Sequence, residues 1–551
     1  MAKRYRPVDR DQPFLLPPDM REWLRADHPV HLVITVVEDH LDTSAFHAGR
    51  KTGGAGTAGY DPDMLAAVLA WAYAHEVTSS RRIEELCRTD VAFRLICGGN
   101  LPDHSTVARF RGDFPAAVGE FFAEVLVLCA RLGMGRLGTV ALDGMKIAAS
   151  ASTAANRTEE GLRKLAAEAV AAHAAADAAE DALFGAGRRG DEVPEAAWSP
   201  RTRGGRIRAA LAGLEAERKA ARAREEAKAE EFRARQAAGQ RTGCSPVSAA
   251  VELAEEQLAR VMAAPQARID DWQARNAASL AATGKPLRNP PRQPASGHCR
   301  VKAAAAKVEA ARARQQAAEQ RAAEREKNCK GPGPVRNVTD PDSRLMPVRG
   351  GGFTQGYNAE NVTSQDGLII ATELTDDPTD MAWFEPMMTQ AQEAAALIEA
   401  HRPAPDPGSG GHAGGPGGGI GQALADAGYC SEANLTCPGP DRLIAVGKRR
   451  DLEKAARGQD GGGDQDWGGE AVRAMRERLK TEEGITAYRQ RGHIAETPHG
   501  HIKHNMGLRQ LSVRGKPKAS AEWKFACAIY NLFKAISTGH LTPEALAALA
   551  S

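Results

Sequence analysis

Three acidic residues stand at positions from which carboxylates can do chemistry together. Asp143 follows the short apolar run at 139–142, and Asp426 follows a similar run at 423–425. Glu496 opens the last region with a helical pattern. Three carboxylates that meet at one point cannot all stay ionised without cations, so such a cluster predicts divalent metal. Two metals held in this way activate the attacking oxygen and stabilise the leaving oxygen of a phosphodiester. Taken singly, each aspartate also fits an ordinary turn at a strand end.

The elements around these acids predict a mixed sheet. A hairpin is expected at 355–374, and 443–446 is a further apolar run of strand length. Helix patterns follow at 381–400 and 470–480. This order places two of the acids on neighbouring strands and the third on a helix packed across them. The fold class predicted for this part is α/β.

Residues 1–130 predict a small all-helical domain, because short amphipathic patterns alternate with turn residues. Pro102 to Thr106 provides a capping side chain, and Arg109 and Arg111 follow in the first turns of the next helix. This arrangement suits a helix-turn-helix that enters a DNA groove. A helical bundle with two solvated arginines explains the same residues equally well.

Residues 155–335 are rich in Ala, Arg and Glu and contain hardly any large apolar side chain. The composition favours exposed helical hairpins or a coiled coil. Since this segment leaves one strand and returns just before the hairpin, we expect an insertion whose two ends lie close together.

The whole-chain composition constrains the partners only weakly. Lys+Arg at 72 against Asp+Glu at 70 gives a net charge of +2, so an acidic partner must be recognised by local patches. The nine cysteines form no C-x-x-C pair, which favours reduced thiols over a zinc ribbon or disulfide framework. No apolar run of about 18 residues is present, so we expect a cytoplasmic protein that makes no use of a membrane.

A spaced set of polar residues marks the C-terminal region. Tyr488 and Arg491 precede Glu496, and Lys503 lies seven residues after that acid. On a continuous helix Glu496 and Lys503 would share a face, about 10 Å apart along the axis. The carboxylate can then bind metal while the ammonium reaches a neighbouring phosphate. The guanidinium of Arg491 suits bidentate phosphate contact.

Four histidines near this set invite a zinc interpretation: His493, His499, His501 and His504. Their spacing fits no single helical face, so imidazoles that face DNA or solvent are the better interpretation. Asp380, just before a helix pattern, is expected to be an N-cap.

The sequence motifs around these residues resemble those of one family, the bacterial insertion-sequence transposases of the DDE class. Members of this family have a helical N-terminal domain and a Y-x2-R, E-x6-K signature. The resemblance rests on GYDP (59–62), IEELC (83–87), PDHSTVARFR (102–111), ALDGMKIAA (141–149), QGYNAE (355–360), ADAGYCSEANL (425–435) and the stretch 488–503. In the family pattern the three acids fall on Asp143, Asp426 and Glu496.

The resemblance implies an RNase H-like catalytic domain that cleaves DNA and transfers strands with two Mg²⁺ or Mn²⁺ ions held by the three acids. It implies a helical DNA-binding domain at 1–130, a first catalytic strand region at 136–154, the insertion at 155–335 and the remaining catalytic domain at 336–540. The implied partner is double-stranded DNA, as terminal inverted repeats and as target, bound by a homodimer near the nucleoid. Contacts to DNA are expected from Arg109, Arg111, Tyr488, Arg491 and Lys503.

Two departures from the family pattern support an alternative function. The spacing from Arg491 to Glu496 is one residue longer than the commonest form, and Thr497-Pro498-His499-Gly500 stands where an acid and Pro-Val-Phe-Gly are expected. The alternative is a catalytically decayed transposase that only binds terminal repeats.

Overall fold

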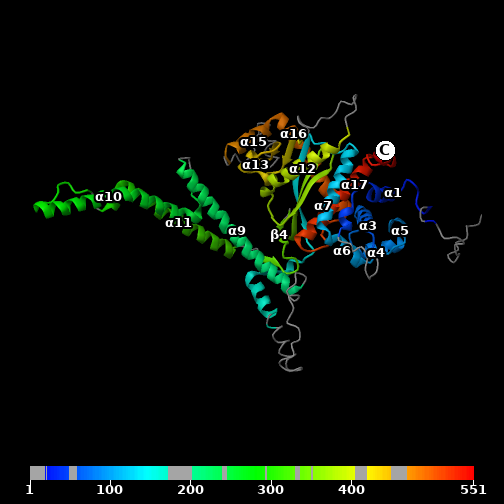
Figure 1. The fold of residues 1–551 in the computed structure, drawn as a ribbon, viewed down its shortest axis with the longest axis horizontal. Coiled ribbons are helices and arrows are strands. Elements are labelled where there is room, and N and C mark those ends of the chain that lie inside the picture. Colours follow the sequence, from blue (N-terminus) through cyan, green and yellow to red (C-terminus); the bar gives the residue numbers. More distant parts are fainter. Residues whose placement is uncertain are drawn as a thin grey trace, which may run out of the picture. The chain divides into compact units, whose positions relative to one another are not determined.

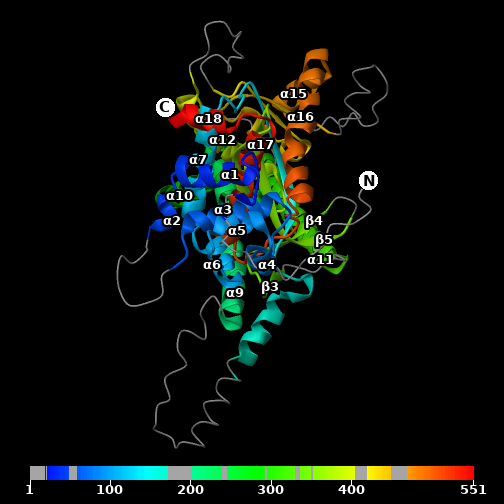
Figure 2. The same ribbon diagram turned by 90° about the vertical axis from the view of Figure 1, so that its right-hand side faces the viewer.

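The computed structural model describes residues 19, 22–48, 59–169, 171, 202–238, 245–291, 294–328, 335–348, 351–403, 419–447 and 468–550. The chain divides into two compact units. Unit 1 joins Met1–Asn156 to Asn337–Ser551, and unit 2 is Arg157–Arg336. Figures 1 and 2 show the elements of both units in two views at right angles.

Six strands form one mixed sheet in unit 1. They are β1 (Thr139–Ala148), β4 (Arg344–Pro347), β5 (Phe353–Ser364), β6 (Ile369–Thr375), β7 (Gln422–Ala425) and β8 (Asp441–Ile444). Their order is β4-β5-β1-β7-β8, with β6 paired to β5. β1 runs antiparallel to β5 and parallel to β7, which in turn runs parallel to β8. The hairpin predicted at 355–374 is confirmed, because β5 and β6 pair antiparallel.

Helices and short turns from the C-terminal half of the chain complete unit 1, and α12, α15, α16 and α17 contact the sheet. They are η7 (Met381–Trp383), α12 (Phe384–His401), η8 (Ala427–Tyr429), α13 (Glu432–Thr436), α15 (Glu470–Lys480), α16 (Glu482–Gly500), η9 (His501–Asn505), α17 (Lys516–Ser537) and α18 (Pro543–Ala550). α16 contacts β1, β5 and β7, whereas α17 contacts β6. α17 buries the ring of Trp523, whose indole N–H donates to Thr372 Oγ1 at 2.8 Å. The indole ring of Trp523 is thus buried against the sheet with its polar N–H hydrogen-bonded.

The N-terminal part is helical, as the sequence predicts. Its elements are α1 (Pro29–Thr35), η2 (Val36–His40), α2 (Ser44–His47), α3 (Pro62–Ala74), α4 (Ser80–Thr89), α5 (Val91–Cys97), α6 (His104–Asp113) and α7 (Pro115–Arg131). Asp103 caps α6 by accepting from the backbone N–H groups of Ser105 and Thr106 at 2.9 and 3.0 Å. α17 packs against α3, α6 and α7, so these helices and the sheet share one apolar core.

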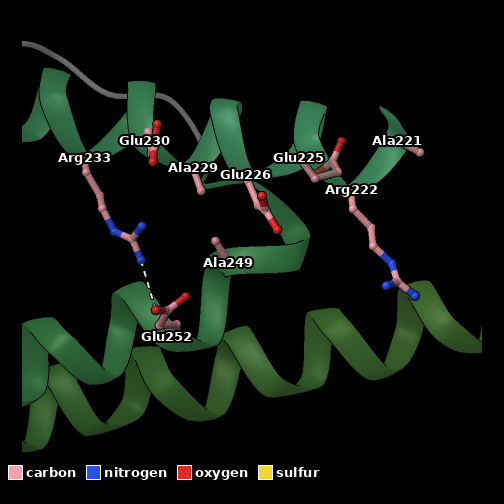
Figure 3. A pocket seen from close by; sticks show the side chains of 9 residues that line it. All are labelled: Ala221, Arg222, Glu225, Glu226, Ala229, Glu230, Arg233, Ala249 and Glu252. Atoms are coloured by element: carbon pink, nitrogen blue, oxygen red, sulfur yellow. Dashed lines mark ion pairs between the residues drawn. The ribbon is translucent and has the colours of Figure 1, made fainter. Parts of the chain in front are cut away.

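Unit 2 consists mainly of three long helices, α9 (Arg203–Ala237), α10 (Ala250–Thr283) and α11 (Cys299–Asn328), with short turns η5 (Val247–Ala249) and η6 (Ala295–Gly297). α10 and α11 lie side by side (Figure 1). A groove between α9 and α10 is lined mostly by charged side chains, and Arg233 pairs with Glu252 across it at 3.1 Å (Figure 3). The helical character predicted for the segment is confirmed, and its coiled-coil character stays a prediction.

The ends of the inserted segment pair with each other. β2 (Asn156–Thr158) and β3 (Val335–Asn337) form a two-stranded sheet, and the short turn η3 (Thr153–Ala155) precedes β2. The expected closeness of the two ends is therefore observed. Among the described residues, no helix is long and apolar enough to cross a membrane.

Candidate active site

Two of the three predicted acids lie together because their strands are parallel neighbours. Leu142 of β1 is in register with Ala425 of β7, and an aspartate follows each of them. Asp426 comes directly after β7, whereas β1 continues through Asp143 to Ala148 rather than ending at that acid. Asp143 therefore lies beside Asp426, which starts the turn η8 and accepts from the backbone N–H of Gly428 at 2.8 Å. Burial raises the pKa of the Asp426 carboxyl, Arg491 lowers it and Asp143 raises it further.

The guanidinium of Arg491 lies between these carboxylates. Its Nη2 is 2.7 Å from Asp143 Oδ1 and 3.8 Å from Asp426 Oδ2. Burial opposes the charge of Arg491, but Asp143, Tyr488, Asp426 and Glu496 outweigh it and raise the pKa of the guanidinium. A buried cation thus bridges two acids at the point where the sequence predicts metal.

Helix α16 positions Arg491, and its start is set locally. Thr481 accepts from the backbone N–H of Gly484 at 3.0 Å, and Glu482 and Glu483 occupy the positive end of the helix dipole. The hydroxyl of Tyr488 donates to Ala425 O at 3.3 Å, which ties the helix to β7. Tyr488 and Arg491 are both buried, so each faces the sheet.

Glu496 does not join the two aspartates in this structure. It lies in the last turns of α16 rather than opening a helical region, because that helix already begins at Glu482. Its side chain is exposed, while Ala495 beside it is buried. Among the described residues, the group of three metal-binding side chains with ligand atoms within 4.8 Å of one another is His47, Asp61 and Asp63, not the three predicted acids. Lys503 lies half-exposed in the π-helical turn η9, outside α16.

A second polar network borders the acid pair. Glu360 is buried on β5 opposite Gly144, and it accepts hydrogen bonds from Tyr429 Oη and Asn358 Nδ2. Asn358 Nδ2 also donates to Asp380 Oδ1 at 2.7 Å. Burial raises the pKa of Glu360 to about 8, although the hydroxyl of Tyr429 opposes the shift. Because Tyr429 ends the turn that Asp426 begins, this network fixes the loop that carries the second acid.

Asp380 belongs to the same network, and its predicted role as an N-cap is wrong. Its side chain makes no capping hydrogen bond and instead pairs with Lys146 Nζ at 3.0 Å. A Cβ atom at Gly144 would lie 2.9 Å from Asp380 Oδ1 and 3.0 Å from Glu360 Oε1, so only glycine fits below these oxygens. The sequence signal for this network was the run of polar residues inside a strand, which must find partners when buried.

His499 is a further residue that the sequence interpretation misplaced. Its side chain is 7% exposed, and Nδ1 lies 3.6 Å from Asp143 Oδ2. The other ring nitrogen, Nε2, has no hydrogen-bond partner within the described part of the chain. The expected solvent- or DNA-facing imidazole is therefore wrong for His499, because α16 turns this residue toward β1.

The two arginines of α6 have different surroundings. Arg109 is exposed and donates hydrogen bonds to the first turn of its own helix, to Ser105 O at 3.3 Å and to Thr106 Oγ1 at 3.4 Å. Arg111 is buried, donates to Ser512 Oγ at 2.6 Å and lies 3.5 Å from Glu522. The DNA contact expected of Arg111 does not fit its place in the core.

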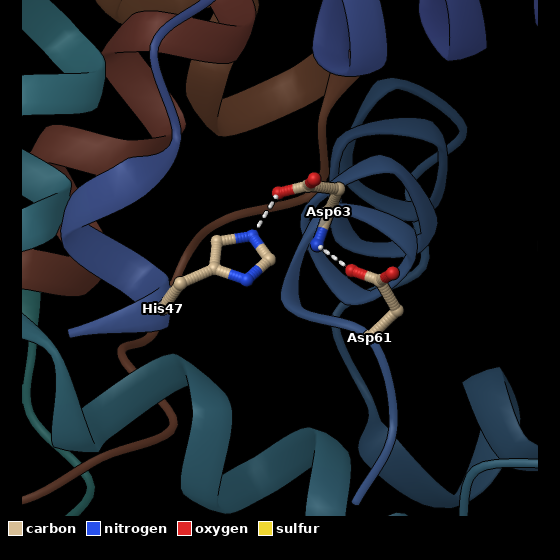
Figure 4. A group of neighbouring side chains, drawn as sticks. All are labelled: His47, Asp61 and Asp63. Carbon is tan, nitrogen blue, oxygen red and sulfur yellow. Dashed lines mark hydrogen bonds and ion pairs between the residues drawn. The ribbon is translucent and has the colours of Figure 1, made fainter. Parts of the chain in front are cut away.

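The residues present fit divalent metal. Asp143 and Asp426 offer hard oxygen donors, and a positive group already lies between them. The more exposed cluster of His47, Asp61 and Asp63 also brings ligand atoms together, but its contacts are those of an ion pair and a helix cap (Figure 4). We therefore assign the candidate active site to the acid pair and α16.

Two family models match this chain. A DUF772 transposase domain matches residues 18–113, and a transposase DDE domain matches residues 465–536. The second match contains α16, and the first ends with α6. Comparisons with curated proteins and with solved structures found no match.

The two matched domains are both transposase domains. Together they support the recognition of this chain as an insertion-sequence transposase of the DDE type.

Proposed function

We propose that this chain catalyses metal-dependent cleavage and strand transfer at the ends of an insertion sequence. The observation that carries the proposal is the pair Asp143 and Asp426 on adjacent parallel strands, with Arg491 between them. Two partly buried carboxylates on neighbouring strands favour a cation between them, and the guanidinium supplies one without metal. Divalent ions at this point would activate water and stabilise the leaving oxygen of a phosphodiester.

We propose further that the catalytic part is RNase H-like and that Glu496 is the third metal-binding acid. A mixed sheet with Asp143 inside β1, Asp426 directly after the neighbouring β7 and a helix packed across both strands supports this proposal. Glu496 is on that helix and interacts electrostatically with Arg491. Arg491 and Tyr488 face the sheet and would hold the two aspartates in place. They would contact DNA only where it enters the site.

DNA recognition is proposed for cationic side chains at two places. Arg109 on α6 is exposed and Lys503 on η9 is half-exposed, so both can meet phosphates. Double-stranded DNA, as terminal inverted repeats and as target, is the proposed partner, bound by a homodimer that forms on the DNA.

One observation favours the alternative, a decayed transposase that only occupies terminal repeats. Glu496 is exposed and stands apart from the two aspartates, so this copy has two acids in place rather than three. Binding without cleavage would follow if α16 never brings the third acid to the metals.

A strand-cleavage assay separates the two functions. The purified chain is incubated with labelled DNA carrying the ends of its own element, with Mg²⁺ or Mn²⁺. We expect cleavage that Asp143→Asn, Asp426→Asn and Glu496→Gln each abolish, while DNA affinity changes by less than about tenfold. Asp377→Asn is the matched control, because that carboxylate accepts from Thr379 N–H outside the acid pair. Binding without cleavage by the wild-type chain would establish the alternative.

A further inference from the structure

His499 occupies an unusual place beside the acid pair. It lies on α16 two turns beyond Arg491, and both side chains face Asp143 from the same helix. Arg491 approaches Oδ1 of that carboxylate, whereas His499 Nδ1 is 3.6 Å from Oδ2. Each carboxylate oxygen of Asp143 therefore lies near a different side chain.

The hydrogen bonds around His499 do not explain why an imidazole is buried at this position. A buried polar atom usually has a hydrogen-bond partner, because leaving it unpaired destabilises the folded chain. Nε2 of His499 has none among the described residues, and the distance from Nδ1 to Asp143 exceeds that of a hydrogen bond. An apolar ring would fill the same space without that cost.

The distance does suit two ligands of one metal ion. Metal–nitrogen and metal–oxygen bonds of about 2.0–2.2 Å allow two ligand atoms to lie up to about 4.3 Å apart. Nδ1 of His499 and Oδ2 of Asp143, 3.6 Å apart, are within that limit. An imidazole nitrogen is also a better ligand for divalent transition-metal ions than for Mg²⁺.

We propose that His499 binds the metal of this site through Nδ1, together with Asp143. The proposal rests on the proposed function, since it adds a nitrogen ligand to the same metal site. A mixed nitrogen and oxygen donor set favours Mn²⁺ over Mg²⁺. The ion would enter where the Arg491 guanidinium now neutralises the two aspartates.

Pulsed electron paramagnetic resonance of bound Mn²⁺ tests this directly, because a coordinated imidazole nitrogen modulates the echo. The full chain is measured with His47→Asn, which removes the imidazole of the three-residue cluster with ligand geometry that the described residues contain. We expect nitrogen modulation in this chain. We expect it to vanish in H47N/H499F, where the aromatic ring is kept and both ring nitrogens are lost, while Mn²⁺ affinity falls about tenfold or more.

The controls distinguish the inference from the function beneath it. His493→Asn changes an exposed imidazole of the same helix and should leave the modulation intact. His499→Gln is a second variant without an imidazole, for use if the phenylalanine unfolds the chain. One result overturns the ligand role of His499 and leaves the proposed function standing. In it, the chain binds Mn²⁺ and D143N abolishes that binding, but no nitrogen modulation is seen. Modulation that survives both substitutions of His499 overturns it as well. Mn²⁺ binding that is absent, or unchanged in D143N, overturns both proposals.

Discussion

Replacing Glu360 by glutamine should change the way in which the stability of the chain depends on pH. Burial raises the pKa of this carboxyl to about 8, from an ordinary value of 4.5. An acid with a raised pKa binds its proton more tightly in the folded chain than in the unfolded chain. Its stabilising contribution is therefore complete below pH 4.5 and is lost as the pH rises through 8.

The size of the loss follows from these two values. The difference between 8 and 4.5, at about 1.4 kcal/mol for each pKa unit, gives a full loss of about 5 kcal/mol above pH 8. About 3 kcal/mol is already lost at pH 7. Glutamine cannot ionise, so the free energy of unfolding of Glu360→Gln should stay nearly flat over the same range. Urea unfolding followed by circular dichroism from pH 5 to pH 9, with EDTA present, measures both curves.

The control is Glu373→Gln, the same chemical change at the cross-strand neighbour of Glu360 on β6. The Glu373 carboxylate is partly exposed and pairs with Lys524 Nζ at 2.9 Å. This variant should follow the pH dependence of the wild-type chain. Parallel curves for the wild-type chain and Glu360→Gln would refute the reasoning, because the carboxyl would then titrate alike in the folded and unfolded chains.

Two further predictions concern buried polar contacts. Arg111→Met leaves Glu522 buried without its cation and should lower the free energy of unfolding by about 3–5 kcal/mol. Arg109→Ala should change the free energy of unfolding by less than about 0.5 kcal/mol. The same variant should weaken DNA binding in a salt-dependent way. Thermal unfolding and a DNA titration at two salt concentrations check this pair, and equal stability of the two variants would contradict it. Tyr429→Phe removes the hydrogen bond to the network that holds the Asp426 loop and should lower kcat for cleavage about tenfold or more with little change in DNA affinity. Tyr530→Phe, which loses a hydrogen bond to Gly367 O in the turn between β5 and β6, is its control and should cleave normally. Equal kcat in both variants would argue against positioning by Tyr429.

Local sequence signals were sufficient for most elements. The helix predicted at 470–480 is α15, and the apolar run at 443–446 overlaps β8. Capping side chains, apolar periodicity and turn residues act within a few residues, so they can be read without the fold. The start of α16 was missed because its capping residue, Thr481, follows α15 without a gap or a turn signal.

Local patterns were enough to predict apolar strand segments just before Asp143 and Asp426, the helical insertion and the resemblance to a transposase family. Which side chains meet at the site depends on the packing of β1, β7 and α16. Register between β1 and β7 brings the aspartates together, and the rotation of α16 turns Arg491 and His499 inward while Glu496 faces outward. The same packing buries Arg111 against Glu522 and joins the N-terminal helices to the core of the sheet. Helix rotation and strand register depend on contacts between residues hundreds of positions apart, so periodicity along the chain does not specify them.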